Sequence, residues 1–396
     1  LPILLVYSLA VGVAILLLPV RLERWLRRFK IRYVRNERIL LVGLCLAVFA
    51  GGAVYAIFSR SWPDERHAFE AAAVIAEDGL AQFFSDYAQL TWLGRQHPPL
   101  IPLLYGAVLR LVGLNLYAIR LVSLLSAVGT ILTTYALSDE LYGQSSRWLA
   151  VLFMVCMPLF LLHGSTAMID MQVTFFFSLA MLTILRLRRE ASWQLAVAAG
   201  VVIGMGLLSK YTMVLIYPLL LCLFLMDAPL RQRKPHLAIV LLVSLSILAG
   251  WLAFAYRLGL LETQTSTLTF YAGVVTRLGF GIQFLLENLL TKLPSALGVY
   301  NLPWLLLGIV HAARRRNQAD LYVLLWAFVI FVLVTITLPD KRYYMPAFPA
   351  LAILMALGLG RIRGGSFRTI TLALFYCAGT LYLLVDWYRA DHLFVR

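Results

Sequence analysis

Charged side chains are scarce in this chain, and acidic ones are the scarcest. Charged residues make up 13% of the 396 residues, and only 19 are Asp or Glu. Hydrophobic residues make up 62%, which excludes an ordinary soluble domain. The net charge is nevertheless +15, and no nucleic-acid-binding motif accompanies it. Because cytoplasmic loops of membrane proteins are rich in Lys and Arg, the composition predicts a protein that crosses a bilayer many times.

Residues that bind metals or form disulfides are also few. The four cysteines lie in apolar stretches without a CxxC or zinc-type spacing, at Cys45, Cys156, Cys222 and Cys377. They are expected to be small buried hydrophobic residues. A metal site would need a denser cluster of His and carboxylates than the sequence offers, so none is predicted, and a divalent cation stays open as a cofactor.

Apolar stretches approach the roughly 20 residues that are needed to cross a bilayer in about twelve places. They lie at about 1–20, 39–58, 117–137, 147–164, 170–187, 193–209, 211–226, 237–257, 296–312, 320–338, 343–360 and 368–386. The sequence therefore predicts an all-α, polytopic integral membrane protein with one membrane domain, 1–396. The stretch 1–20 has no basic segment before it and no cleavage site after it. It is expected to be an extra N-terminal span rather than a signal peptide.

Basic clusters between the stretches predict the orientation. They are the segment 21–38, Arg186/Arg188/Arg189, Arg231/Arg233/Lys234, Arg314/Arg315/Arg316 and Arg361/Arg363/Arg368. All are expected on the cytoplasmic side. The stretch 100–113 is too short to cross, and if it crossed, the later basic clusters would face the opposite side from 21–38. It is therefore predicted to be an in-plane helix.

This topology places two long loops outside the cytoplasm. Residues 59–116 are expected to form a catalytic loop with interfacial helices. The Thr-rich, Gly-containing residues 258–295 are expected to form a mobile substrate loop. The predicted location is the plasma membrane of a bacterium or archaeon, with the active site on the non-cytoplasmic side.

Two adjacent acids, Asp64 and Glu65, follow six residues after a hydrophobic stretch that ends near Phe58. Trp62 and Pro63 before them are typical of a helix start. Carboxylates at the mouth of a membrane span are unusual unless they bind or catalyse something. They could accept a proton or stabilise a cationic transition state, and the alternative is a cap on a surface helix.

Further candidates lie at the expected outer ends of other spans. Asp170, in HGSTAMIDMQVTFFF, is expected to have a partner elsewhere in the fold or to be a solvated helix cap. Lys210, in GLLSKYTMV, suits a phosphate ligand or a residue that reaches toward lipid headgroups. Lys341 and Arg342, followed by Tyr343, suit an anionic headgroup. His97 precedes two prolines and is expected to point toward Asp64, with a structural role as the alternative.

In this order, these motifs resemble the GT-C superfamily of membrane glycosyltransferases. The resemblance is strongest to the protein O-mannosyltransferase branch and the lipid A aminoarabinose transferases, and it runs from about Ile39 to Leu359. It rests on DERHAFEAA, RQHPPLIPLLYG, AIRLVSLLSAVGTILTTYALSDELYG, STAMIDMQVTFFFSLAML, GMGLLSKYTMVL and KRYYMPAFPALAIL. It implies a GT-C fold. It also implies inverting transfer of a sugar from a polyprenyl-phosphate carrier to a lipid, glycan or protein acceptor.

The resemblance also implies roles for individual residues. The implied catalytic carboxylates are Asp64, as base or orienter of the acceptor, Glu65 and Asp170. The implied ligands of the carrier phosphate are Lys210, Lys341, Arg342 and Tyr343. The aminoarabinose transferases usually have Lys where this chain has His97 and Arg where it has His67, so both histidines are further candidates and the donor sugar stays open.

Two other functions stay open from the sequence. A transporter or flippase of lipid-linked sugars would share the helices, but it would place its acids in broken helices at the bilayer midplane. A non-catalytic scaffold subunit would use the same fold to hold a partner.

Overall fold

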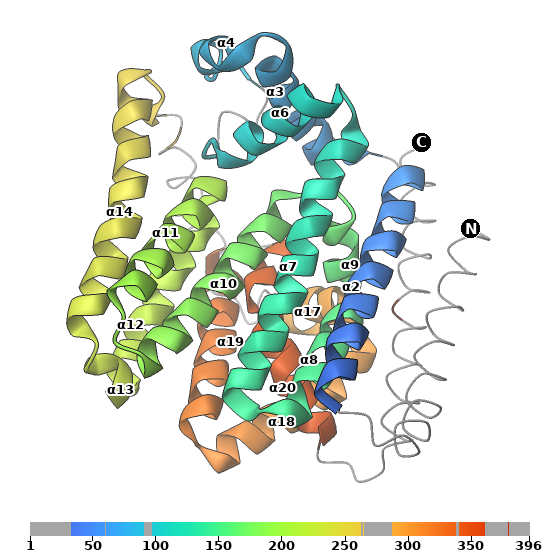
Figure 1. Ribbon diagram of the computed structural model, residues 1–396, viewed down its shortest axis with the longest axis vertical. Helices are drawn as coiled ribbons and strands as arrows, with labels where there is room; N and C mark the ends of the chain where they lie inside the picture. The colour runs from blue at the N-terminus through green and yellow to red at the C-terminus, as the bar shows by residue number, and fades with distance from the viewer. Residues whose placement is uncertain are drawn as a thin grey trace.

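The computed structural model describes residues 33–59, 61–90, 97–262, 264, 287–337, 340–360 and 379. Every element within these residues is helical (Figure 1). The predicted span 1–20 and all of the predicted span 368–386 except residue 379 lie outside the described residues. So do Cys377, the basic cluster Arg361/Arg363/Arg368 and most of the loop 258–295.

Most of the described elements follow one another with short connections, whereas 30 residues, most of them outside the described part of the chain, separate α14 from η2. In chain order they are α2 (Tyr33–Phe58), α3 (Pro63–Glu77), α4 (Gly79–Ser85), α6 (Leu100–Val112), α7 (Leu116–Tyr142), α8 (Gln144–Val155), α9 (Pro158–Gly164), α10 (Ile169–Arg189), α11 (Trp193–Ser209), η1 (Tyr211–Leu215), α12 (Ile216–Met226), α13 (Ala228–Arg231), α14 (Lys234–Arg257), η2 (Asn288–Lys292), α17 (Leu293–Leu297), η3 (Val299–Asn301), α18 (Leu302–Arg315), α19 (Gln318–Thr337), η4 (Lys341–Ala347) and α20 (Phe348–Gly360).

Several of these helices are long and apolar enough to cross a membrane. Six meet this description in the described part of the chain, at Leu41–Phe58, Leu116–Tyr142, Ile169–Arg189, Lys234–Arg257, Gln318–Thr335 and Lys341–Gly360. Two bent pairs, α8 with α9 at 70° and η2–α17 with η3–α18 at 96°, raise the number to eight if each is one span. The all-helical, multi-pass architecture is thus confirmed, whereas twelve spans are not.

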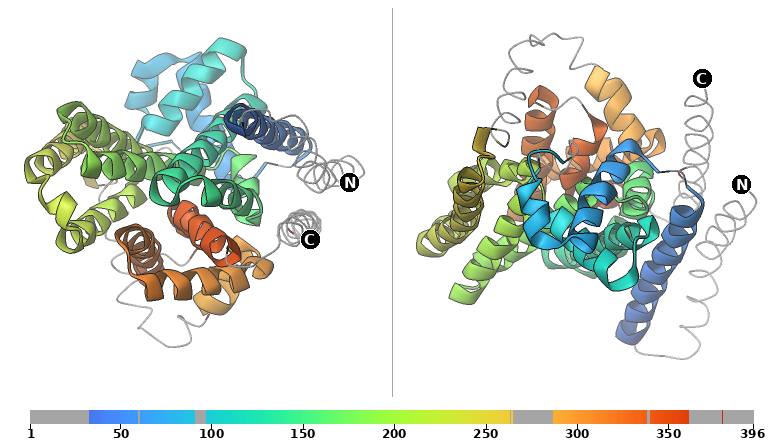
Figure 2. Two further views of the ribbon diagram at one scale, coloured as in Figure 1. Left: turned by 60° about the horizontal axis from the view of Figure 1, so that its bottom comes forward. Right: turned by 90° about the horizontal axis from the view of Figure 1, so that it is seen from above.

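Two helices form the centre of the bundle. The apolar windows of α10 and of η4–α20 are 78% and 89% buried, whereas those of α2 and α14 are only 17% buried. Figure 2 shows α11, α12 and α14 on one flank and α18 and α19 on another, with α7, α10 and α20 between them. An apolar helix that is enclosed on all sides in this way belongs to the protein core, while α2 and α14 keep broad apolar surfaces outward.

The helices α18 and α20 approach each other backbone to backbone at two glycines. A Cβ atom on Gly308 would lie 1.8 Å from the carbonyl oxygen of Leu354, and one on Gly358 would lie 2.2 Å from that of Trp304. Small residues at a crossing allow this close approach between membrane helices.

Gly308→Ala is therefore expected to lower stability, because the backbone of α20 must move away from the new methyl group. Overpacking of this kind costs about 1–3 kcal/mol or more. The thermal unfolding midpoint of the purified protein in detergent measures the loss. Gly250→Ala in α14 is the matched control, since a Cβ there meets nothing within 4 Å. Equal midpoints for the two variants would contradict the close-packing argument.

One end of the bundle carries α3, α4 and α6, which gather above the long helices (Figure 1). The helix α6 covers the stretch predicted to lie in plane, and it packs on α3 across this end. A small apolar core joins them to α7, through Ala68, Ala72, Ile101, Tyr105, Leu109 and Ile119. Their shared apolar face holds the start of α3 in a fixed place.

The opposite end of the bundle gathers basic clusters from distant parts of the chain. Arg188, at the end of α10, binds Asp227 before α13 and Gln318 at the start of α19. Arg233 donates a hydrogen bond to the carbonyl of Arg189, 3.4 Å away. Among the described residues, the basic clusters around Arg188 and Arg233 therefore lie at the same end of the bundle.

Candidate active site

A small pocket lies where five separate segments of the chain meet. Its lining residues are Asp64, His97, Ala167, Met168, Ile169, Asp170, Lys210 and Arg342. Five of these eight are ionisable residues that the sequence analysis named as candidates. The fold brings together, for example, Asp64 and Arg342, which are 278 positions apart in the chain.

Four of the five ionisable groups reach the pocket from the end of a helix. Asp64 lies in the first turn of α3, after Pro63, and Asp170 lies in the first turn of α10. Acidic side chains at these positions face the positive ends of helix dipoles. Lys210 follows the last residue of α11 in extended backbone. Arg342 lies at the start of η4, where its backbone N–H donates to Asp340 Oδ1 at 3.1 Å.

The charged groups form two ion pairs of different exposure. Lys210 Nζ lies 2.6 Å from Asp170 Oδ1, and both side chains are 4% exposed. Arg342 Nη1 binds Asp64 Oδ2, and these side chains are 18% and 29% exposed. One pair is therefore enclosed, and the other lies where a ligand can reach it.

Tyr343 holds both cations against its ring. Lys210 Nζ lies 4.5 Å and Arg342 Cζ lies 5.5 Å from the ring centroid. Such contacts with an aromatic face stabilise a cation and fix its position. Tyr343 is thus a buried support for the cations rather than a lining residue. Lys341 is also not among the residues that line the pocket.

The ion pair with Lys210 uses only one of the two carboxylate oxygens of Asp170. Asp170 Oδ2 is buried and has no hydrogen-bond partner among the residues that the structure describes. Buried polar atoms without a partner are rare in folded proteins and indicate a place where a ligand or water binds. Because Asp170 lines the pocket, this oxygen is available to accept a hydrogen bond there.

His97 is an uncharged member of the pocket. Burial lowers its pKa to about 3, and the charges of Lys210 and Arg342 lower it further against the opposing effect of Asp170. Its position is fixed by Tyr87, whose hydroxyl donates to the His97 carbonyl. At neutral pH, His97 can donate or accept a hydrogen bond, but it adds no positive charge to the pocket.

This low pKa predicts a loss of stability in acid. In the unfolded chain His97 binds a proton below its ordinary pKa of about 6.5, while the folded protein binds one only below about 3. Stability should therefore fall as pH decreases from about 6.5, by about 3 kcal/mol at pH 4.5. Thermal unfolding of wild type and His97→Gln at pH 7 and pH 4.5 measures this loss of stability. The variant should lose less stability than wild type in acid, and an equal loss would contradict the prediction.

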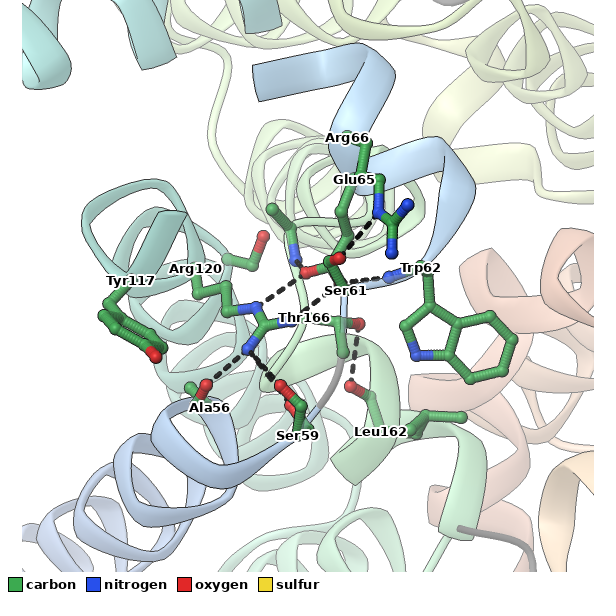
Figure 3. A network of polar contacts seen from close by, with 12 residues as sticks. Ala56, Ser59, Ser61, Trp62, Glu65, Arg66, Tyr117, Arg120, Leu162 and Thr166 are labelled. Carbon is green, nitrogen blue, oxygen red and sulfur yellow. Dashed lines mark hydrogen bonds and ion pairs between the residues drawn. The ribbon is translucent and has the colours of Figure 1, made fainter. Parts of the chain in front are cut away.

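Glu65 points away from the pocket and into a buried network (Figure 3). Its Oε1 accepts from Arg120 Nε at 2.8 Å and from the backbone N–H of Ala167 at 2.6 Å. Its Oε2 accepts from Arg120 Nη2 and from the backbone N–H of Trp62, both at 2.9 Å. Glu65 and Arg120 are fully buried. With both oxygens occupied, Glu65 is poorly placed for the catalytic role implied by the family resemblance.

The other side of Arg120 binds the end of α2. Its Nη1 donates to the carbonyl of Ala56 and to the carbonyl and hydroxyl of Ser59, at 3.2 and 3.1 Å for the two Ser59 atoms (Figure 3). The Glu65–Arg120 pair therefore ties α2, α3, α7 and the turn before α10 together. The sequence analysis did not single out Arg120, although a lone Arg in an apolar helix is itself an unusual signal.

A second polar network holds α10 beside α6 and α7. The amide of Gln172, two residues after Asp170, lies 2.9 Å from both the Tyr105 hydroxyl and the Ser123 hydroxyl. These buried contacts fix the first turn of α10 and so the position of Asp170. His67, one helical turn after Asp64, does not line the pocket. Within the described residues, no three His, Cys, Asp or Glu side chains form a cluster that could hold a metal ion.

The sequence and the fold both resemble known membrane glycosyltransferases. Residues 96–254 match the family model described as dolichyl-phosphate-mannose-protein mannosyltransferase. This region contains His97, Arg120, Asp170 and Lys210, but not Asp64 or Arg342. No curated protein sequence matches the chain significantly.

Solved structures with this fold come from a bacterium and an archaeon. Two structures of ArnT from Cupriavidus metallidurans, one in the apo state and one bound to undecaprenyl phosphate, are each 21% identical to this chain with a TM-score of 0.61. The match to the apo structure covers 83% of this chain and 60% of ArnT. The match to the bound structure covers 84% of this chain and 61% of ArnT. The Archaeoglobus fulgidus oligosaccharyltransferase tethered with an acceptor peptide is 16% identical, with a TM-score of 0.59 and coverage of 86% and 55%. The chain thus spans about 60% of the length of ArnT. It has the GT-C fold, as the sequence motifs predicted.

Proposed function

We propose that the protein is an inverting glycosyltransferase that moves a sugar from a polyprenyl-phosphate carrier to an acceptor hydroxyl. The observation that carries this proposal is the pocket itself, where two cations and two carboxylates meet at the end of a membrane bundle. Structures of this fold have been solved with undecaprenyl phosphate and with a dolichol-phosphate. A phosphate at Arg342 and Lys210 would place its sugar among the carboxylates.

The cations suit the leaving group. As the bond between the sugar C1 and the phosphate oxygen breaks, its electron pair passes to the carrier phosphate and increases the negative charge there. Arg342 offers a planar fork of donors to phosphate oxygens, and Lys210 offers a compact positive charge. Stabilising charge that develops in the transition state is the largest contribution that such a site makes.

The carboxylates suit the acceptor and the sugar. The acceptor oxygen attacks C1 from the face opposite the phosphate, and Asp64 takes the hydroxyl proton as the new C1–O bond forms. The free Oδ2 of Asp170 accepts a hydrogen bond from a hydroxyl of the bound sugar. His97, being neutral, donates or accepts without repelling either cation. Glu65 and Arg120 fix the position of the backbone at Asp64 relative to the turn before α10.

We also propose that the pocket faces the non-cytoplasmic side. The Arg-rich junctions lie at the other end of the bundle, and clusters of this kind are retained on the cytoplasmic side. A lipid-linked donor suits this placement because it needs no nucleotide outside the cell.

The proposal is tested with purified protein in lipid nanodiscs and a panel of polyprenyl-phosphate sugars. Release of free polyprenyl phosphate is followed with membrane extract as the source of acceptor. Wild type is expected to release the carrier from one donor, and Lys210→Met is expected to lose most of this activity. Asp86→Asn is the control, since Asp86 binds Gln82 on the same loop and does not line the pocket. No release from any donor would overturn the transferase in favour of a flippase or scaffold.

A further inference from the structure

Arg342, which lines the pocket, contacts three other side chains. Its Nη1 binds Asp64, its Nε lies 3.2 Å from Asp340 Oδ2, and its guanidinium lies over the ring of Tyr343. Asp64 is the group that the proposed function assigns as base, and Arg342 is the group assigned to the carrier phosphate. The residue assigned to the acceptor and the residue assigned to the carrier phosphate therefore bind each other.

We propose that the carrier phosphate competes with Asp64 for Arg342, so that donor binding itself releases the base. This inference rests on the proposed function, and it adds the order in which the donor binds and the acceptor is activated. While Arg342 holds Asp64, one carboxylate oxygen is occupied and its charge is offset by the guanidinium. A phosphate that takes over the guanidinium leaves that oxygen open to an acceptor hydroxyl.

The geometry favours exchange at this pair and not at the other one. Lys210 and Asp170 are 4% exposed, so separating them would leave buried charges without partners. Arg342 and Asp64 are 18% and 29% exposed, where water or a ligand replaces a lost partner at small cost. The enclosed pair can thus stay intact while the open pair exchanges.

The surroundings also decide which partner moves. Arg342 keeps its contacts with Asp340 and Tyr343 when Asp64 leaves. The backbone beside Asp64 is held by Glu65, whose carboxylate binds Arg120 and two backbone N–H groups (Figure 3). The exchange therefore requires only a side-chain rotation of Asp64, with α3 and η4 in place. An acceptor hydroxyl would be activated only after the donor has bound.

This model makes an unusual prediction about binding. Asp64→Asn removes the competitor and should tighten the binding of undecaprenyl phosphate, about threefold to tenfold. The same substitution in an Arg342→Gln background should give a smaller gain, because there is no guanidinium left to free. The four proteins form a double-mutant cycle, which isolates the coupling between the two residues. The dissociation constant for undecaprenyl phosphate is measured in nanodiscs by intrinsic fluorescence.

Each outcome decides the question. If removing Asp64 improves binding equally or more without Arg342, simple repulsion between two anions explains the gain and the exchange is wrong. Weaker or unchanged binding by Asp64→Asn also overturns it, as does the same gain in Asp86→Asn, which changes the charge by the same amount. If wild type binds no undecaprenyl phosphate, the proposed function fails instead. Asp64→Ser serves the same comparison if Asp64→Asn does not fold.

Discussion

Replacing Asp64 by Asn is expected to abolish sugar transfer while leaving the fold intact. The amide has the shape of the carboxylate but cannot accept the proton of the incoming hydroxyl. A positioned general base contributes about 100- to 10,000-fold to the rate, so kcat should fall by that amount. The rate of polyprenyl phosphate release at saturating donor measures it.

The structure permits a sharp control for this result. Asp64 is partly exposed and binds one side chain, so the substitution should leave the thermal unfolding midpoint near that of wild type. The KM for the donor should not rise, because the substituted side chain does not hold the phosphate. Turnover close to that of wild type would exclude Asp64 as the base. If Asp170→Asn alone abolished kcat, the role would move to Asp170.

Most of the pocket was predictable because its charged residues are unusual in a chain that is largely apolar. Asp170, Lys210 and Arg342 each interrupt an apolar pattern at the expected end of a span. A charge in that position is costly unless it has a partner or a function. The sequence therefore identified the five ionisable residues that line the pocket. The expectation that Asp170 has a partner elsewhere in the fold is met by Lys210. It could not show which acid meets which cation, since those contacts join distant segments.

The sequence could not distinguish neighbours that point in opposite directions. Successive residues on a helix are turned by about 100° relative to each other. Asp64 therefore enters the pocket while Glu65 enters the core, although the sequence made both of them candidate catalytic carboxylates. Adjacent residues in η4 differ in the same way, and Lys341 does not join Arg342 in the pocket wall.

Twelve spans are not confirmed among the described residues for a related reason. Hydrophobic length does not show where a stretch bends. The stretch 147–164 is broken by a 70° turn at the start of α9, where Pro158 occupies the first helical turn. The stretches 193–209 and 211–226 form helices of fewer than 18 residues. In each case the proline or the short loop that marks the change lies inside a run that is otherwise uniformly apolar.

The largest effect on stability is expected from Arg120→Met. Arg120 and Glu65 are both fully buried, so removing the guanidinium leaves a carboxylate without its main partner inside the protein. Breaking such a pair costs about 3–5 kcal/mol. The thermal unfolding midpoint should fall far more than in Arg186→Met, which breaks an exposed pair with Glu140 at the other end of the bundle. Similar midpoints for the two variants would show that the buried pair is not needed for the fold.

A double variant then separates the charge from the position it holds. Glu65→Leu with Arg120→Met removes both charges, which should recover part of the lost stability. Recovery should be incomplete, because the N–H groups of Ala167 and Trp62 lose their acceptor, at about 1–3 kcal/mol each. These two N–H groups lie in the segments that carry Asp170 and Asp64. The double variant should therefore fold and yet have a low kcat. If its kcat equalled that of wild type, the Glu65–Arg120 pair would stabilise the fold without positioning the catalytic residues.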